Sequence, residues 1–303
     1  MQPIIQSIHH GAKAGADACR LFHGRGHCHP GLEFISVDWF APVLLISLYK
    51  EPNAEWLAQL SREITQFDHQ PDIANIILQH RYMAGAPSES LKGKLEGDYY
   101  AEERGLKFRL NFKANQNVGF FLDMANCRQV LREHVKGKSV LNLFAYTCAF
   151  SVVAAEAGAA QVVNVDMAKG ALNTGRTNHQ CNNIDTRGVS FLGHDIFKSW
   201  GKIRRYGPYD MVIIDPPSFQ AGSFNVMKDY QKIVRKLPGL LSPQAQVIAC
   251  LNSPDLSFSF LRELFADARG FVEKQLIATP ASFPEVDAEK GLKTLLFETS
   301  REA

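Results

Sequence analysis

The sequence predicts a doubly wound α/β fold with a mostly parallel, seven-stranded sheet, preceded by a smaller α/β domain. The central observation is residues 139–166, which read as a buried strand, a tight turn, a helix and a second strand that stops at Asp166. From there to residue 298, apolar strand patterns alternate with helical ones. Such alternation indicates a parallel sheet with helices on both faces. The last two strands follow each other without a helix, which suits an antiparallel ending.

Composition bounds the class of protein. The 303 residues are 46% hydrophobic and 21% charged, as in ordinary globular proteins. The net charge of +2 gives no indication of a polyanionic partner. The six cysteines form no CxxC pair, so a disulfide framework or a zinc ribbon is not expected. The chain has no apolar run of about 18 residues, and its first residues lack a signal-peptide pattern. We therefore expect a cytoplasmic protein with reduced thiols and no membrane association.

Residues 1–114 are expected to form the small domain. The first 18 residues read as a loosely held lead-in, and 84–97 as a loop. A helix should begin near Asn53, a suitable N-cap, because Trp56, Leu57, Leu60, Ile64 and Phe67 then share one face. Strands are expected at 19–22, 32–38, 43–49 and 73–79, followed by a hairpin over 99–113.

Residues 115–303 are expected to form the large domain. Helices are predicted up to His134 and over 150–158, 169–183, 198–205, 228–241 and 256–269. The seven strands are predicted at 139–144, 162–166, 188–192, 209–215, 246–250, 271–278 and 292–298.

The turn after the first of these strands indicates the ligand. It contains neither Gly-x-Gly-x-x-Gly nor Gly-Lys-Ser/Thr, so it offers no phosphate cradle. An acid at the end of the next strand, Asp166, can accept ribose hydroxyls or cap the following helix. An adenosine ligand without phosphates fits, and S-adenosylmethionine is such a ligand.

Val140 to Val152 resembles motif I of the class I methyltransferases, above all the RNA-modifying branch with Asn-x-Phe-Ser-Tyr-Thr-Gly-Gly-Phe. Cys148 and Ala149 stand where that family usually has two glycines, which implies a slightly tighter pocket. The resemblance implies a Rossmann-like sheet and S-adenosylmethionine as cofactor. It places the cofactor-binding residues at Phe121, Asp123, Asn142, Phe144, Ala145, Tyr146, Thr147, Cys148, Asp166, Met167, Asp195, Ile196 and Asp215.

Three of these positions have specific expected roles. Asp195 follows the third strand, where class I enzymes bind the adenine amino group; the less favoured alternative is that it caps a helix that starts at Ile196. The segment Gly119-Phe120-Phe121-Leu122-Asp123 resembles one that closes over the cofactor in bacterial 23S rRNA methyltransferases. Phe121 and Asp123 are therefore lid candidates; the alternative is ordinary core.

Asp215-Pro216-Pro217-Ser218-Phe219 resembles the Asp/Asn-Pro-Pro-aromatic signature of methyltransferases that act on nucleic-acid bases. The prolines hold an extended turn that aims Asp215 and nearby carbonyls at the transferred methyl group. Asp215 could then orient a base amino group, and Phe219 could stack on an extruded base. The resemblance thus implies Asp215, Pro216, Pro217 and Phe219 as catalytic residues. A plain turn is the alternative.

Cys250 bears on the methylated atom. Methylation at a pyrimidine carbon needs a thiolate nucleophile, and the 5-methylcytosine enzymes of this group carry a Thr-Cys-Ser-Cys-Ser-like segment here. Residue-for-residue alignment puts their nucleophile at Asn252 and the other cysteine at Cys250. Relatives that methylate guanine nitrogens have Ser/Asn-rich segments instead. We therefore expect Cys250 to be a packed core thiol, which leaves the target atom open.

A cluster of His23, His27, Cys28 and His29 has suitable ligand types for a metal, but no second half-site lies at standard spacing. The surrounding residues, Arg20-Leu-Phe-x-Gly, Pro30-Gly31-Leu32 and Val37-Asp38, resemble the loop before the methyltransferase domain in bacterial 23S rRNA methyltransferases, which binds no metal, so no metal is expected.

Together these observations predict a methyltransferase acting on a base in RNA, with 23S rRNA as the expected substrate. The small domain should help to hold the RNA, through placed groups such as Arg20, Arg25 and Arg81. A methyltransferase for a protein or small molecule, and a cofactor-binding module without catalysis, remain as alternatives. The sequence gives neither the target nucleotide nor the oligomeric state.

Overall fold

The computed structural model describes residues 1–303 except 14, 16, 66–71, 114–115, 218, 221–223, 269 and 301–303, and it describes Phe219 and Gln220 by their backbone alone. The chain divides into two compact units. Unit 1 comprises Met1–Leu122 and Ala281–Val286, and unit 2 comprises Asp123–Pro280 and Asp287–Ala303. The predicted boundary after residue 114 lies within unit 1. The chain thus leaves unit 2 after Pro280 and returns to it at Asp287.

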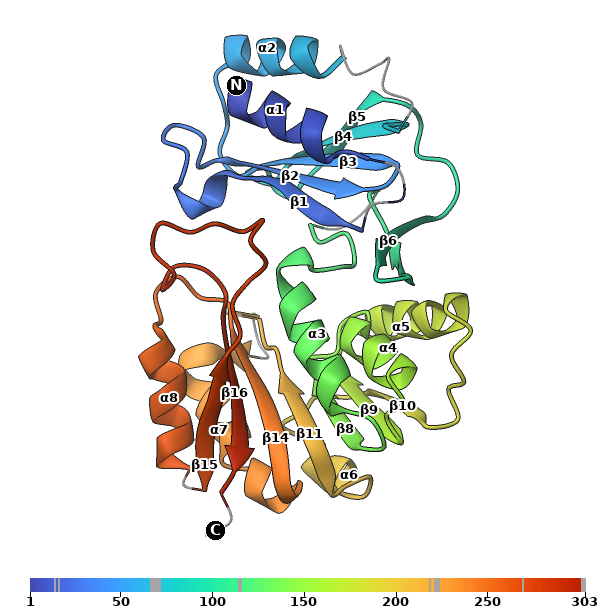
Figure 1. Ribbon diagram of the computed structural model, residues 1–303, viewed down its shortest axis with the longest axis vertical. Coiled ribbons are helices and arrows are strands. Elements are labelled where there is room, and N and C mark those ends of the chain that lie inside the picture. The colour runs from blue at the N-terminus through green and yellow to red at the C-terminus, as the bar shows by residue number, and fades with distance from the viewer. Residues whose placement is uncertain are drawn as a thin grey trace. The chain divides into compact units, whose positions relative to one another are not determined.

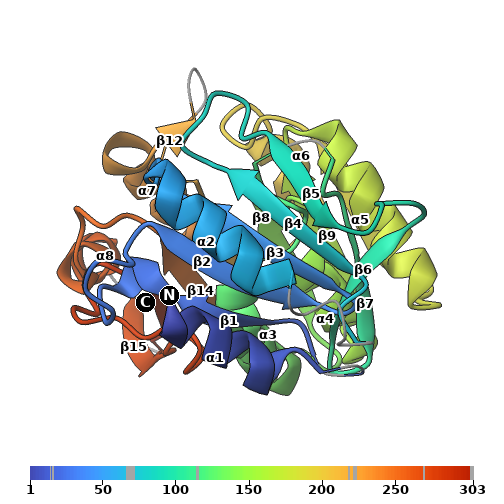
Figure 2. The same ribbon diagram turned by 90° about the horizontal axis from the view of Figure 1, so that it is seen from above.

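Unit 1 is built on a five-stranded sheet in the order β1-β2-β3-β4-β5. Neighbouring strands are antiparallel except β3 and β4, which are parallel. Two helices, α1 and α2, cover one face of this sheet (Figure 1; Figure 2). The bounds are α1 Gln2–Gly11, β1 Cys19–His23, β2 Ile35–Phe40, β3 Val43–Leu48, α2 Ala54–Thr65, β4 Asn75–His80 and β5 Ser88–Lys92.

The core of unit 1 explains two corrections to the sequence analysis. The start of the chain was expected to be loosely held, but it forms α1. The side chains of Ile4 and Ile8 on this helix are completely buried against the apolar side chains of the sheet. These two isoleucines lie one helical turn apart, and Pro3 stands in the first turn, so the helix signal was present. The expected loop over 84–97 contains β5, whose side chains are exposed or half-buried and give no strand pattern.

Other elements of unit 1 follow the prediction. Asn53 Oδ1 accepts a hydrogen bond from the Trp56 N–H at 2.7 Å, which confirms it as the cap of α2. Phe67, expected on the same helical face, lies outside the described residues. The predicted hairpin is present as β6 (Tyr99–Glu103) and β7 (Leu106–Leu110).

Unit 2 contains a seven-stranded mixed sheet in the order β10-β9-β8-β11-β14-β16-β15. The first five strands of this order are mutually parallel, and β16 runs antiparallel to both of its neighbours (Figure 1). The bounds are β8 Ser139–Leu143, β9 Gln161–Asp166, β10 Val189–Gly193, β11 Tyr209–Ile214, β14 Leu241–Leu251, β15 Phe271–Leu276 and β16 Lys293–Thr299. The predicted α/β fold is confirmed.

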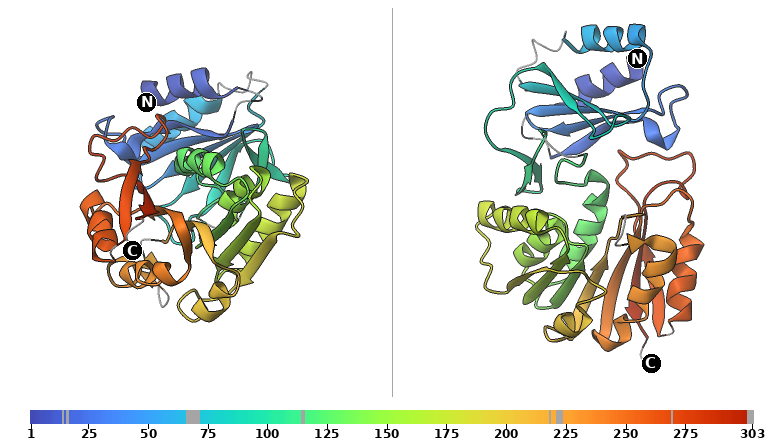
Figure 3. Two further views of the ribbon diagram at one scale, coloured as in Figure 1. Left: turned by 60° about the horizontal axis from the view of Figure 1, so that its bottom comes forward. Right: turned by 180° about the vertical axis from the view of Figure 1, so that it is seen from behind.

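Helices cover both faces of this sheet, as the view from behind shows (Figure 3). Side chains along β8 point alternately to the two faces of the sheet, and both faces are apolar. Val140 packs with α3 and α4, whereas Leu141 and Leu143 pack in a second cluster with α6, α7 and α8. The helices are α3 Ala125–His134, α4 Ala149–Glu156, α5 Lys169–Cys181, α6 Trp200–Arg204, α7 Val226–Val234 and α8 Phe258–Asp267. Of these, α6, α7 and α8 are shorter than predicted. No helix among the described residues is long and apolar enough to cross a membrane.

Candidate cofactor and catalytic site

Most of the predicted site residues in unit 2 stand at or just after the carboxyl ends of its parallel strands. Strands β8, β9, β10 and β11 are parallel, so their carboxyl ends meet at the same edge. From β8 the chain continues to β9 on one side and only later reaches β11 on the other. In open α/β sheets, ligands bind at such a reversal of strand order.

The turn after β8 is held in an unusual backbone conformation. Phe144, Tyr146 and Cys148 have φ of 58°, 45° and 62°, in the left-handed region that favours glycine. A non-glycine residue there costs on the order of 1 kcal/mol, and such strain concentrates at ligand sites. The turn is fixed by hydrogen bonds from the Ala145 N–H to Val165 O (3.1 Å) and from the Tyr146 N–H to a carboxylate oxygen of Asp166 (2.8 Å).

Cys148 is accommodated by a glycine on another helix. Its side chain is fully buried, and burial raises the pKa of the thiol far above its ordinary value. Gly175 of α5 lies against it: a Cβ on Gly175 would stand 2.4 Å from the Cys148 Sγ and 2.9 Å from its Cβ. The missing side chain at position 175 therefore provides the space that the cysteine occupies. Thr147 is buried beside it, and its carbonyl accepts a hydrogen bond from Asn178 (2.9 Å).

Asp166 has the geometry expected of a ribose acceptor. One oxygen accepts from the Tyr146 N–H and the other from the Ala168 N–H, both at 2.8 Å. Two backbone donors thus fix the plane of the carboxylate, and each oxygen keeps a lone pair for a further donor. The side chain is half-buried at the end of β9. The two remaining acceptor positions therefore fit a ligand with two adjacent hydroxyls. Asp166 also orders the turn that leads into α5.

A buried polar network lies beneath the turn. Asn142 on β8 donates to Asn164 on β9 (2.9 Å), and Asn164 donates to the Ser151 hydroxyl (2.8 Å). Ser151 contacts the His179 Nε2 (3.0 Å), and burial lowers the pKa of this imidazole. Asn142, predicted to bind cofactor, is 1% exposed, so its side chain ties β8 to β9. Sequence reasoning missed this network, although two asparagines in register on apolar strands were a signal.

The predicted adenine-side residues differ in accessibility. Asp195 Oδ1 accepts from the Phe197 N–H (2.8 Å), and Lys198 Nζ lies 3.6 Å from the other oxygen. Asp195 therefore orders a turn over 196–198. The helix predicted over 198–205 begins at Trp200, so Asp195 does not cap a helix at Ile196. Ile196 is buried, so only its backbone can face a ligand, whereas Met167 is 48% exposed.

Asp215 stands at the end of β11 in a charged, desolvated environment. Burial and, to a smaller extent, the Asp123 carboxylate raise its pKa to about 7, although the Arg128 guanidinium opposes both effects. Arg128, on α3, is only 2% exposed and was not singled out from the sequence. Pro216 is buried and Pro217 is exposed. A carboxylate whose pKa lies near neutrality, with a cation close by, is suited to accepting a hydrogen bond or a proton.

The rest of the predicted catalytic motif is described only in part. Ser218 lies outside the described residues, as does the side chain of Phe219. The backbone of Phe219–Gln220 forms β12, which pairs with β13 (Phe224–Asn225). Phe144 contacts Phe224 edge to face, with ring centroids 5.1 Å apart. Phe121, a predicted lid residue, is 39% exposed at the end of the first segment of unit 1.

Cys250 is a packed core thiol, as predicted. It is fully buried, and the Cys127 thiol beside it, followed by burial and the Asp215 charge, raises its pKa well above the ordinary value. Its carbonyl accepts a hydrogen bond from the Tyr230 hydroxyl (3.2 Å). Asn252, two residues later, is exposed.

The histidine cluster of unit 1 is arranged around an ion pair. Arg20 forms two hydrogen bonds to the Asp38 carboxylate (2.7 and 3.1 Å) and a third to His23 Nδ1 (2.8 Å). Because arginine can only donate, His23 Nδ1 accepts, and its Nε2–H donates to Glu285 (3.2 Å). No group of three or more metal-ligating side chains converges within the described part of the chain.

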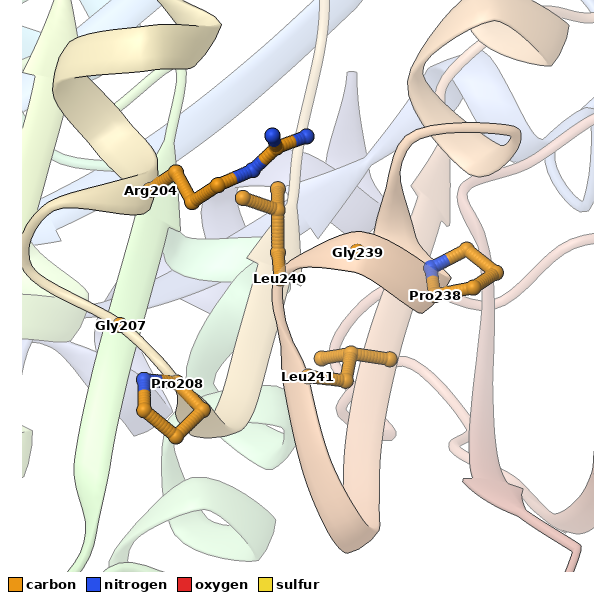
Figure 4. Close-up of a pocket in the computed structure, with 7 residues that line it drawn as sticks. All are labelled: Arg204, Gly207, Pro208, Pro238, Gly239, Leu240 and Leu241. Carbon is orange, nitrogen blue, oxygen red and sulfur yellow. The ribbon is translucent and has the colours of Figure 1, made fainter.

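A separate pocket of about 270 Å³ lies at the opposite edge of the unit 2 sheet, where β11 and β14 begin (Figure 4). It is lined by Arg204, Gly207, Pro208, Pro238, Gly239, Leu240 and Leu241. Because the predicted ligand lies at the carboxyl ends of the strands, this pocket is not part of the site.

Comparisons with known proteins agree with this geometry. Residues 19–298 match the family model described as S-adenosylmethionine-dependent methyltransferase. The ribosomal RNA large subunit methyltransferase I of Shewanella denitrificans is 31% identical over 286 residues, which cover 86% of this chain and 71% of that protein. Its namesake in Aeromonas hydrophila is 33% identical over 171 residues, 55% of this chain and 43% of that protein.

Among solved structures, SMU.776, a methyltransferase complexed with SAH, superimposes with a TM-score of 0.85 at 26% identity, covering 98% of this chain and 80% of that one. The chain spans between 43 and 71% of the length of the two curated relatives. It belongs to the S-adenosylmethionine-dependent methyltransferase family.

Proposed function

We propose that this chain transfers a methyl group from S-adenosylmethionine to a base of large-subunit ribosomal RNA. The observation that carries the proposal is the juxtaposition of two motifs. The Asp-Pro-Pro turn and the motif I turn leave the same edge of two adjacent parallel strands, whose ends pair at Ile214 and Leu143. The methyl acceptor and the cofactor can therefore meet there. The names of the curated relatives support rRNA as the substrate.

The residues at this edge fit the cofactor. Asp166 would take the ribose hydroxyls with the lone pairs left on its fixed carboxylate. Asp195 and the Ile196 backbone would contact the adenine, and the turn from Ala145 to Cys148 would face the methionine end. When bound, S-adenosylmethionine supplies a methyl group on a positively charged sulfur, which needs an aligned nucleophile more than it needs covalent help from the protein.

Asp215 would hold that nucleophile in line. With a pKa near 7, its carboxylate can accept a hydrogen bond from a base amino group and then take up the proton released by methylation. Arg128 would keep Asp215 from becoming wholly protonated in its desolvated site. Pro216 and Pro217 would fix the direction of the turn, and Phe219 would stack on the base.

The burial and the raised pKa of the Cys250 thiol support methylation of a base nitrogen over methylation of a pyrimidine carbon. A fully buried thiol with a strongly raised pKa is a poor nucleophile. Asn252, at the position of the nucleophile in the 5-methylcytosine enzymes, cannot attack a ring carbon but can hydrogen-bond a base edge. The amino group or a ring nitrogen of the base is therefore the proposed target.

The small domain, residues 1–114, is proposed to hold the RNA, and the site of action is the cytoplasm. Residues 1–98 carry 8 Lys plus Arg and 11 Asp plus Glu, a net charge of 8 − 11 = −3, and residues 1–114 as a whole carry 12 and 13, a net charge of 12 − 13 = −1. Such a domain cannot bind RNA as a broad electrostatic clamp, so it must act through a few placed groups.

The experiment is transfer of a labelled methyl group from the cofactor to rRNA, tRNA and total protein. Label in 23S rRNA alone supports the proposal, and Asp215→Ala serves as a control that should still bind the cofactor. Phe219→Ala should also keep cofactor affinity within a few-fold while losing most methyl transfer. Label in protein would instead support the alternative substrate class, which fold alone does not exclude.

A further inference from the structure

Two arginines in unit 1 share one aromatic ring. The guanidinium carbon of Arg25 lies 4.3 Å from the centroid of the Tyr49 ring, and that of Arg81 lies 5.1 Å from it. The two guanidinium groups are thus at most 4.3 + 5.1 = 9.4 Å apart. Both distances are typical of a cation held over an aromatic ring.

The topology of unit 1 brings these residues together. Tyr49 and Arg81 directly follow β3 and β4, which are parallel and end in register at Leu48 and His80. The Arg81 N–H donates to Leu48 O at 2.8 Å, so the two residues leave the sheet side by side.

Arg25 is presented by a short 3-10 helix, Gly24–Gly26, that is clamped on both sides. A Cβ on Gly24 would stand 1.8 Å from Leu32 O, and one on Gly26 would stand 1.7 Å from Pro284 O. The backbone around Arg25 is therefore fixed while its side chain is exposed.

These two arginines differ from Arg20, which we also expected to contact RNA. Arg20 is committed to Asp38 and His23 and packs over Phe283 at 4.4 Å, so it is a structural residue. In the part of the chain that the structure describes, neither Arg25 nor Arg81 forms an ion pair.

The neighbours of Arg81 leave its charge uncompensated. Its Nη2 donates to the neutral Asn117 amide oxygen at 3.3 Å, and its buried Nε has no partner among the described residues. Two cations at most 9.4 Å apart without an ion pair repel each other, and an anion that contacts both would relieve that repulsion.

We propose that Arg25, Tyr49 and Arg81 form a contact site for the phosphates of a single RNA strand. The inference rests on the proposed function and names where the small domain meets its substrate. Arginine fits because its planar group binds phosphate oxygens in pairs. Tyr49 is a positioning residue that orients the two guanidinium groups. In a domain whose residues 1–114 carry a net charge of −1, this pair gives the RNA a defined place to bind.

The test compares RNA binding by the full chain and by single and combined variants. Arg25→Gln and Arg81→Gln each remove one charge, and Arg62→Gln is the matched control, because Arg62 is an exposed arginine on α2 with no ion pair in the described structure. Binding of a labelled 23S rRNA fragment is measured by fluorescence anisotropy from about 50 to 200 mM salt.

Each of the two test variants should weaken binding by roughly three- to tenfold and lower the slope of log K against log salt by about 0.7. Arg62→Gln should stay within about twofold of wild type. Tyr49→Leu should weaken binding in the wild-type background but add little once both arginines are glutamine. Because the Arg25 side chain is exposed, Arg25→Gln should fold normally. Unchanged RNA affinity and unchanged salt dependence in this variant would overturn the inference.

Two further measurements separate this inference from the proposed function. Wild-type chain that methylates 23S rRNA, with variants that bind it normally, overturns the inference and leaves the function intact. Wild-type chain that transfers no methyl group to any RNA overturns the function. If the arginines instead govern binding of an acidic polypeptide such as polyglutamate and not of RNA, the assigned partner is wrong.

Discussion

The pairing of Cys148 with Gly175 can be tested by a double-mutant cycle. In Gly175→Ala, the new methyl group meets the Cys148 Sγ at 2.4 Å, more than 1 Å inside an ordinary van der Waals contact. Neither group can move into solvent, because Cys148 is fully buried. Overpacking of this kind costs about 1–3 kcal/mol, against a gain of roughly 1 kcal/mol from replacing a helical glycine by alanine. At 2.4 Å the upper end applies, so Gly175→Ala should lose about 2 kcal/mol.

In a Cys148→Gly background, Gly175→Ala should increase the free energy of unfolding instead of lowering it. The nearest remaining contact of the new methyl group is then Thr147 O at 3.3 Å, so the helix gain of roughly 1 kcal/mol should prevail. The coupling energy between the two sites is therefore about 3 kcal/mol. Cys148→Gly alone should be close to neutral, because relief of the left-handed backbone (φ 62°) offsets the loss of a buried thiol.

Urea unfolding of the four proteins measures this cycle, and Gly170→Ala provides the control. Gly170 lies in the same helix with open space where its Cβ would be, so alanine there should stabilise in either background. Gly175→Ala effects that agree in both backgrounds within about 0.5 kcal/mol would show that the glycine does not make room for the cysteine.

Four further predictions concern the site and the pH response. Asp166→Ala should weaken S-adenosylmethionine binding by about tenfold or more in calorimetry without unfolding the chain, since it removes two charge-assisted acceptors; unchanged affinity would remove the ribose assignment. The rate of methyl transfer should rise with pH through about 7 and then level off, because the pKa of Asp215 is raised to that value and the carboxylate is the active form. A flat profile in single-turnover experiments would contradict this role. Burial, with Arg20 and Arg25, lowers the pKa of His23 from 6.5 to about 3, so the unfolded chain binds a proton in that window that the folded chain does not. The free energy of unfolding should therefore fall below pH 6.5, by up to about 1.4 kcal/mol per pH unit, and His23→Gln should flatten the curve measured by thermal melts. Cys250→Ala should keep substantial activity and lose on the order of 1 kcal/mol of stability, whereas Asn252→Ala should lose more activity; a covalent adduct with 5-fluorocytidine-substituted rRNA that requires Cys250 would reverse this ranking.

The sequence indicated the elements of unit 2 because each is defined by local periodicity. Strand β8, its turn and β9 with Asp166 at its end can be read from short apolar runs and one polar residue. The cap at Asn53 is likewise a local signal. Such features depend on residues a few positions apart, and a single sequence contains that information.

Features that depend on distant partners could not be read in this way. Asn142 was predicted to contact the cofactor, but its side-chain amide donates a hydrogen bond to Asn164. That residue is 22 positions away in the sequence and comes next to Asn142 only when β8 and β9 pair. Arg20 looked like an RNA contact until the fold placed Asp38 against it. Arg128 gave no signal, because a buried arginine in a helix reads as a surface charge. The membership of residues 281–286 in unit 1 depends on contacts with a part of the chain more than 200 positions earlier.

Mass spectrometry of 23S rRNA nucleosides tests the central claim most directly. A strain that lacks this chain is compared with the same strain carrying the wild-type gene or Asp215→Ala. The account predicts that one nitrogen-methylated nucleoside is absent from the deletion strain, returns with the wild-type gene and does not return with Asp215→Ala. An unchanged set of methylated nucleosides in all three strains, or a lost nucleoside that proves to be 5-methylcytidine, would contradict it.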